Sequence, residues 1–285
     1  MKRILALFIF ILAMMLGSAA VVRFENEDLK ATEMEPGVTV LETTDNTTLY
    51  IVEGDTAAVV IDTGTSIKNL DAIVDSLTDK PYKVIATHGH YDHVGNISFF
   101  PEIYLHEADR NIESAPLQAY RGVINPLRDG DTFDLGGRRL KVVHMPGHTP
   151  GSVVLVDYDN KLVFTGDAFG SGEMWMQLEP QVSFADFIDS CSRMIEIMSE
   201  DGVDKLYVGH YPYAKRTLDM DYMLELVEVA RRIDSGEAAG SEVYKYWPDS
   251  RILRGKQASI VYQPQAEGRK TWKTPTSHLR LEDGK

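Results

Sequence analysis

Hydrophobic and polar positions change period several times along the chain, and these changes predict its elements. Short apolar or alternating runs between turn residues predict strands. These runs are residues 38–42, 47–53, 57–62, 82–87, 103–105, 139–145, 152–157, 161–165, 205–208 and 258–263. Apolar residues three and four apart predict helices from Ser66, near Gly95, near His106, at 183–199 and at 217–234. This order predicts an α/β protein in which two facing sheets are covered by helices, a four-layer αββα sandwich.

The first twenty residues have the pattern of an export signal. Lys2 and Arg3 precede apolar sequence from Ile4 to Leu16, and small residues follow at 17–20, as in a cleaved secretory signal. Uncharged sequence continues to Val22, a length that also fits an uncleaved membrane anchor. In either case we expect the folded part to be exported to the periplasm or the extracellular space.

Composition divides the remainder into three segments. Residues 21–36 are polar and acidic and predict a tether, residues 37–240 have the regular pattern of one catalytic domain, and residues 241–285 predict a partly mobile extension. The net charge of −14, or −16 if Lys2 and Arg3 are removed with the leader, disfavours nucleic acid as a partner. Cys191 is the only cysteine, so no intramolecular disulfide forms, and its place on an apolar helical stripe predicts a core residue.

Metal-binding side chains are dense after the strand predicted at 82–87. His88 and His90 are two residues apart, so that on extended backbone their rings leave from the same side. Asp92 and His93 follow after a turn. Three imidazoles and a carboxylate within six residues suit zinc or another borderline metal.

Further donors stand where later strands end. His148, Asp167 and His210 each follow a predicted strand, and each has a glycine immediately before it. Glycine permits a tight loop and a close approach of backbone to a site. We therefore predict that donors from four strand ends converge on one metal centre.

This donor set resembles the motifs of the metallo-β-lactamase-like superfamily, in order from about residue 38 to 215. The matching residues are His88-x-His90-x-Asp92-His93, His148 in a Gly-His-Thr-Pro-Gly turn, Asp167 after Thr-Gly, His210 after Gly, and Val59–Gly64 as the first motif. The resemblance implies that His88, His90 and His148 bind one metal, that Asp92, His93 and His210 bind the other, and that Asp167 bridges them. Two Zn²⁺ are the implied ions, with Fe or Mn as alternatives. Asp62 either orients a ligand from outside the metal shell or is a turn residue.

A dinuclear centre of this kind predicts a metal-dependent hydrolase, because a bridging water whose pKa falls to about 7 supplies a hydroxide nucleophile. We expect it to cleave an ester, thioester, lactone or related bond of a small molecule, with Asp92 as the catalytic residue that orients the water or relays a proton. True β-lactamases of the fold generally lack a residue like Asp167. Glyoxalase II enzymes usually carry histidine where Ser152 stands. The resemblance is nevertheless closer to glyoxalase II and lactonase-type members than to β-lactamases.

Three alternatives share this scaffold: a phosphodiesterase, a mononuclear iron sulfur-dioxygenase and a non-catalytic metal-binding module. Among residues near the motifs, Trp175 is a candidate wall of an apolar substrate pocket, Tyr211 and Tyr213 are candidates to polarise a carbonyl oxygen, and Arg121 is a candidate contact for an anionic group. Membrane contact is expected only through an uncleaved N-terminal segment. The sequence makes no prediction of the oligomeric state.

Overall fold

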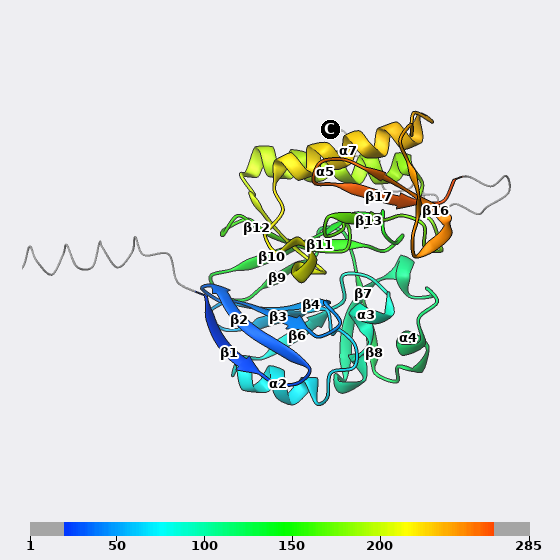
Figure 1. Cartoon of the computed structure of the whole chain (residues 1–285). Helices are drawn as coiled ribbons and strands as arrows, with labels where there is room; N and C mark the ends of the chain where they lie inside the picture. The colour runs from blue at the N-terminus through cyan, green and yellow to red at the C-terminus, as the bar shows by residue number, and fades with distance from the viewer. Residues whose placement is uncertain (1–19, 265–285) are drawn as a thin grey trace, which may run out of the picture.

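Two facing sheets with helices on their outer faces form the computed structural model, which describes residues 20–264 (Figure 1). The first sheet has eight strands in chain order. They are β1 (Val21–Glu25), β2 (Leu29–Glu35), β3 (Val38–Thr43), β4 (Thr48–Glu53), β5 (Ala58–Ile61), β6 (Tyr82–Ile85), β7 (Glu102–His106) and β8 (Val123–Leu127). The second sheet has the order β14-β12-β11-β10-β9. Its members are β9 (Thr132–Asp134), β10 (Arg139–His144), β11 (Val153–Asp157), β12 (Leu162–Gly166) and β14 (Lys205–Val208).

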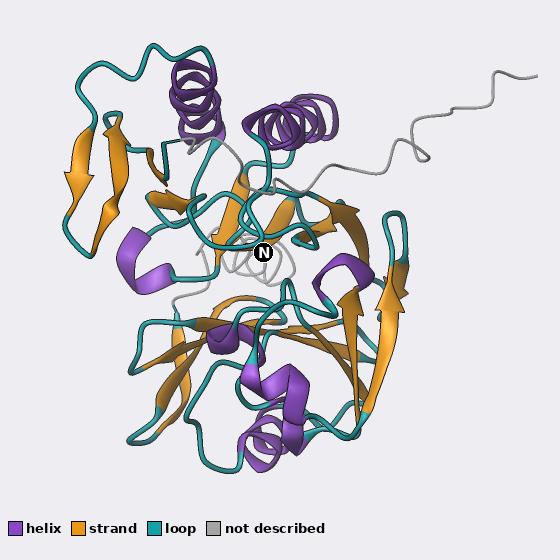
Figure 2. Cartoon of the chain, turned by 90° about the vertical axis from the view of Figure 1, so that its right-hand side faces the viewer, coloured by secondary structure: helices purple, strands orange, loops and turns teal. Residues whose placement is uncertain are grey.

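Three apolar layers separate the sheets and helices, and they confirm the αββα prediction. Figure 1 shows α2 (Leu70–Leu77) under the first sheet and α5 (Phe184–Asp201) with α7 (Met220–Asp234) above the second, and Figure 2 shows the same layers from the side. One buried cluster lies between α2 and the first sheet, a second lies between the sheets, and a third lies under α5 and α7. Each sheet is therefore covered by buried apolar side chains on both faces.

The helices keep their predicted apolar faces, and local backbone fixes their ends. α5 begins at the Ser183 cap, whose hydroxyl accepts from the Asp186 amide at 3.1 Å, and ends at Gly202 in a left-handed conformation. Cys191 is fully buried on this helix, and burial raises its thiol pKa well above the usual value, which fits a core residue. The helix expected from Ser66 begins only at Leu70, because Ser66 and Asn69 both have positive φ and cannot continue a right-handed turn.

Residues 21–36 are a correction to the sequence analysis, which expects a tether there. They form β1 and β2, which pair with each other, and β2 pairs with β3. Leu29 and Ala31 are buried while Lys30 between them is exposed. The segment can be acidic because, apart from Leu29, Ala31 and Thr32, its side chains are exposed or half-buried.

The C-terminal segment is also more regular than expected. β15 (Glu242–Tyr244), β16 (Trp247–Arg254) and β17 (Ser259–Tyr262) form a four-stranded sheet with β13 (Glu173–Trp175). The unassigned stretch before residue 130 contains α4 (Ala115–Ala119) and β8. Residues 1–19 of the predicted leader and residues 265–285 of the extension predicted to be partly mobile lie outside the described residues. Within 20–264, no helix has the length and apolar character needed to cross a membrane.

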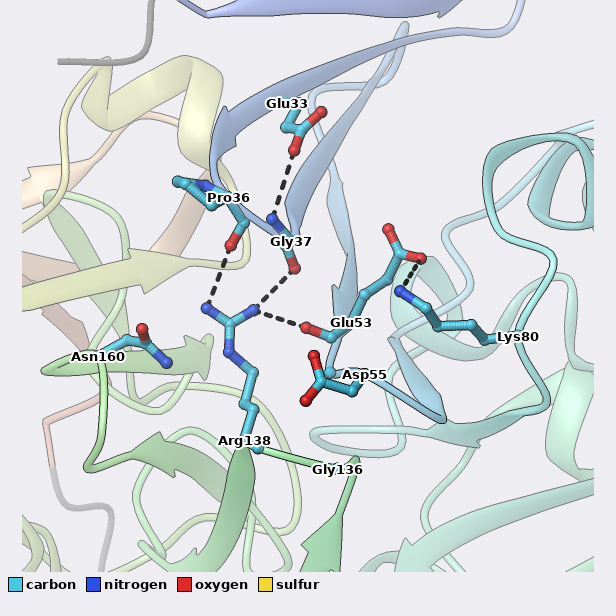
Figure 3. Close-up of a pocket in the computed structure, with 11 residues that line it drawn as sticks. Glu33, Pro36, Gly37, Glu53, Asp55, Lys80, Gly136, Arg138 and Asn160 are labelled. Atoms are coloured by element: carbon cyan, nitrogen blue, oxygen red, sulfur yellow. Dashed lines mark hydrogen bonds and ion pairs between the residues drawn. The ribbon is translucent and has the colours of Figure 1, made fainter. Parts of the chain in front are cut away.

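A buried arginine joins the two sheets at the end of β10 opposite to His148. The Arg138 guanidinium donates to the carbonyl oxygens of Gly37 at 2.9 Å, Glu53 at 3.0 Å and Pro36 at 3.3 Å (Figure 3). Its Nε lies 2.9 Å from Oδ2 of Asp157, which is fully buried. One cation therefore holds the β2–β3 turn, the end of β4 and the end of β11 together.

Candidate metal centre

The donors lie at one edge of the two sheets because the strands that precede them are parallel within each sheet. β5 and β6 run parallel in the first sheet, and β12 and β14 run parallel in the second. The carboxyl ends of parallel strands meet at the same edge, where α/β proteins commonly bind ligands. β6 leads to His88 and to the short helix α3 (Tyr91–Val94), while β12 leads to Asp167 and β14 to His210.

Side chains from the four strand ends converge as the sequence predicts. Ligand atoms lie within 4.8 Å of one another in three groups: His88 with His90 and His148, Asp92 with His93 and His210, and His88 with His93 and Asp167. The first two groups are the two predicted metal sets. Asp167 Oδ2 lies 3.6 Å from Nε2 of His148 in the first set and 3.2 Å from Nε2 of His210 in the second. This carboxylate therefore stands between the sets, as a bridging ligand must.

The donor set fits metal ions because three of its inward atoms lack hydrogen-bond partners. Among the described residues, the buried atoms His88 Nε2, His93 Nε2 and Asp167 Oδ1 have no hydrogen-bond partner. His90 Nδ1 faces His148 Nε2 at 2.8 Å. A buried polar atom without a partner costs about 1–3 kcal/mol, and bound cations would remove that cost at His88 Nε2, His93 Nε2 and Asp167 Oδ1.

The outward ring atoms, by contrast, are held by the protein. His93 Nδ1 contacts Oδ2 of Asp62 at 2.8 Å, His148 Nδ1 donates to the Trp175 carbonyl at 2.8 Å, and His210 Nδ1 donates to the Asn46 carbonyl at 3.0 Å. Contacts of this kind fix the tautomer and direct the other nitrogen inward. Nε2 of all three rings is thereby left for a metal.

Asp62 lies at the end of β5 and holds the histidine loop from behind. Its Oδ1 accepts from the Thr87 amide at 2.7 Å, and its Oδ2 accepts from the Thr87 hydroxyl at 2.8 Å and contacts His93. Its φ of 62 places it in the left-handed region, which costs free energy for a residue other than glycine. Of the two interpretations of Asp62, the contacts favour support of a ligand.

Burial and local charge set the protonation of the cluster. Burial and the neighbouring imidazoles lower the pKa of His88 and His90 well below the usual value, and burial lowers that of His148. Burial also opposes a charge on His93, but nearby carboxylates, Asp167 first, outweigh it and raise the His93 pKa well above its usual value. These shifts favour neutral imidazoles in the first set, whereas a metal that binds at His93 would displace a proton.

Two of the donors, Asp167 and His210, follow a glycine because there is no room for a side chain at that position. A Cβ on Gly209 would lie 2.2 Å from Asp167 Oδ1 and 2.8 Å from His93 Cε1. Gly166 has a φ of +48, and a Cβ there would lie 2.2 Å from the Thr87 hydroxyl. A side chain at either place would push the donors apart, so the glycines allow the second sheet to approach the first.

Asp109, which the sequence analysis does not single out, ties together the loops of the first metal set. It is fully buried, and it accepts from the Gly89 amide at 2.8 Å, the Gly151 amide at 2.6 Å and the Thr149 hydroxyl at 2.7 Å. Burial raises its pKa to about 6, against the opposing effect of these hydrogen bonds. Gly89 separates His88 from His90, and Thr149 follows His148, so Asp109 holds all three ligands in register.

Replacing Asp109 by asparagine should weaken metal binding by about 10–100-fold, the usual effect of losing a partner that orients ligands. An amide nitrogen cannot accept, so at least one of the three donors loses its partner. Competition with a chelating dye measures the affinity. Asp157→Asn is the matched control, because Asp157 is equally buried but pairs with Arg138. Equal metal affinities for both variants would show that Asp109 has no positioning role.

The structure brings some of the candidate substrate residues to the centre. Trp175 is joined to His148 through its carbonyl, and the Tyr213 ring stacks on His210 with centroids 5.7 Å apart. Tyr211 instead packs on Tyr207, with centroids 6.3 Å apart. Arg121 donates to the carbonyls of Gln118 and Tyr120 in its own loop, and within residues 20–264 none of its hydrogen bonds reaches a metal-binding side chain.

Comparison with known proteins agrees with this geometry. The sequence model of the Metallo-beta-lactamase superfamily matches residues 43–210. The chain is 30% identical over 204 residues to the acyl-coenzyme A thioesterase MBLAC2 of Bos taurus, covering 57% of this chain and 72% of that protein. It is 30% identical over 173 residues to the hydroxyacylglutathione hydrolase GloC of Haemophilus influenzae, covering 55% and 81%.

A solved structure agrees at the level of fold. A metallo-β-lactamase of Erythrobacter litoralis superposes with a TM-score of 0.56 at 15% identity, covering 73% of this chain and 99% of that one. The chain belongs to the metallo-β-lactamase superfamily. The predictions of this family and of a metallo-hydrolase are confirmed at that level.

Proposed function

We propose that the protein is an exported dinuclear zinc hydrolase that cleaves an acyl thioester or a closely related ester of a small molecule. The observation that carries the proposal is the position of Asp167 between two complete sets of histidine and carboxylate donors. The thioesterase and hydroxyacylglutathione hydrolase named above both act on thioesters, and they support the choice of bond.

The residues of the centre have different proposed roles because their surroundings differ. Bound divalent metal would supply a water of pKa about 7 and a Lewis acid for the carbonyl oxygen. His88, His90 and His148 would hold one ion, and Asp92, His93 and His210 the other. Asp92 is the carboxylate with the most access to solvent, since its side chain is 24% exposed against 12% for Asp167. It can therefore exchange a proton with water at Oδ2, which lies 3.5 Å from His210 Nε2.

A panel of substrates tests the proposed bond. Purified protein should hydrolyse acyl-coenzyme A and acylglutathione thioesters faster than lactones, bis-phosphodiesters or a chromogenic cephalosporin, and a chelator should abolish every activity. Elemental analysis should give two zinc ions per chain. Turnover of bis-phosphodiesters alone would favour the phosphodiesterase, and one iron per chain with oxygen uptake would favour the dioxygenase. Inactivity of the fully zinc-loaded protein across the panel would support the non-catalytic module.

Export is proposed from the N-terminal sequence, in which Lys2 and Arg3 precede an apolar run and small residues. When cells express the full chain, the protein should be found in the periplasm or the medium. Its N-terminus should be cleaved at about residue 20. Replacing Lys2 and Arg3 by glutamate should retain it in the cytoplasm at full length. A wild-type chain that stays in the cytoplasm would refute the proposal, and one that is exported uncleaved would support the anchor.

A further inference from the structure

A chain of direct contacts joins the metal centre to the C-terminal hairpin. β13 pairs with β17 and β17 with β16, so Trp175 at the end of β13 shares a sheet with the β15–β16 hairpin. The Trp175 carbonyl accepts from His148, and the Trp175 ring lies 4.9 Å from the ring of Trp247. Trp247, the first residue of β16, is thus in contact with Trp175, whose carbonyl holds the ring of the predicted ligand His148.

The hairpin presents aromatic rings to solvent. Trp247 is 38% exposed and Tyr246 is 63% exposed, and Figure 2 shows the hairpin standing out from the body of the molecule at the upper left. Tyr244 behind them is buried, stacks on Trp247 with centroids 6.0 Å apart and donates its hydroxyl to Glu173 at 2.9 Å. Tyr244 therefore fixes the Trp247 ring in place. A fixed, exposed indole favours binding of an apolar group, since covering apolar surface gains about 25 cal/mol per Å².

Exposed tyrosines also stand beside the metal donors themselves. Tyr91, next to His90, is 61% exposed, and Tyr213, stacked on His210, is 64% exposed. The donors are therefore flanked by aromatic rings from α3, from α6 (Tyr211–Ala214) and, through Trp175, from the hairpin. Aromatic surface of this kind complements a hydrocarbon chain.

We propose that Trp247 and Tyr246, together with Trp175, bind the apolar acyl chain of the substrate while its carbonyl lies at the metal centre. This inference rests on the proposed function, and it names the acyl chain as the part of the substrate that the hairpin selects. Trp247 and Tyr246 are specificity-determining residues. They do not contact the thioester bond, which lies at the metal donors. The protein should accordingly prefer long acyl chains to short ones.

Chain-length selectivity tests the inference on the zinc-loaded protein. We expect kcat/KM for a decanoyl thioester to exceed that for the butyryl thioester of the same thiol by at least about tenfold, given that even one methylene in a hydrophobic pocket changes discrimination about 10-fold or more. Trp247→Ala and Tyr246→Ala should each reduce this ratio several-fold, because they lower kcat/KM for the decanoyl thioester more than for the butyryl thioester. Leu224→Ala is the control, because Leu224 is 51% exposed but lies on α7 in the outer helical layer, and it should leave the ratio unchanged.

Calorimetry with chelated, metal-free protein separates this inference from the proposed function. A non-hydrolysable decanoyl thioether should bind wild type and Leu224→Ala alike, and Trp247→Ala about tenfold more weakly. Absence of thioester turnover at every chain length would refute the proposed function, and unchanged thioether binding in Trp247→Ala would refute the hairpin site. Sedimentation with phosphatidylcholine vesicles gives a further test. If wild type binds the vesicles, Trp247→Ala does not, and the chain-length ratio is the same in both, the surface binds lipid and the inference is overturned.

Discussion

Replacing His88 by alanine should lower kcat/KM by about 10³-fold or more, a loss of at least about 4 kcal/mol of transition-state stabilisation. His88 is fully buried, its Nε2 has no partner among the described residues, and it belongs to two of the three donor groups. Its loss removes a ligand of one set and a neighbour of Asp167. Elemental analysis should find about one ion per chain in place of two.

The control for His88→Ala is another histidine outside the donor groups. His144 lies near the same loops, and its Nε2 donates to the Pro150 carbonyl at 2.8 Å while its ring stacks on His106 with centroids 4.0 Å apart. His144→Ala should keep both ions and most of the kcat/KM, because the Pro150 carbonyl and the His106 ring that it contacts are not metal donors. A His88→Ala protein that folds, keeps its metal and turns over normally would refute the whole assignment.

The metal donors could be predicted from sequence because each signal is local. His88 and His90 follow a recognisable strand at alternate positions, and Asp167 and His210 each follow a strand and a glycine. Such positions place side chains at a sheet edge irrespective of the rest of the fold. The four-layer architecture could be predicted for the same reason. The apolar pattern of each strand, and of α5 and α7, lies within a single element.

Residues whose role depends on distant partners could not be predicted in this way. Asp109 is the last residue of a short helical turn at residues 107–109, and the groups it binds lie 20, 40 and 42 positions away. β1 and β2 carried a weak signal, because Leu29 and Ala31 alternate with polar residues, but their high charge suggested a tether. The alternation was the better guide, since charged side chains on the outer face of a paired strand remain in water.

Replacing Arg138 by methionine should destabilise the protein by about 3–5 kcal/mol, because it leaves the Asp157 carboxylate buried without its cation. Arg138 also supplies the donors for three carbonyls of the β2–β3 turn and β4 (Figure 3). At about 2–4 °C per kcal/mol for a chain of this size, the melting temperature should fall by about 10 °C. Urea denaturation in excess chelator measures the loss without a contribution from bound metal.

Two further variants decide whether burial of the charge pair is the cause. Arg193 pairs with Asp129 at 3.0 Å, but their side chains are 45% and 48% exposed, so Arg193→Met should cost at most about 1 kcal/mol. In Arg138→Met/Asp157→Asn no unpaired carboxylate remains at residue 157, and Asn160 still has an acceptor there, to which its side chain donates at 2.9 and 3.0 Å in the native chain. The double variant should therefore be more stable than Arg138→Met alone. If the double variant is not more stable, Arg138 stabilises the protein through its hydrogen bonds to the three carbonyls. The unpaired Asp157 charge then accounts for little of the stability lost in Arg138→Met.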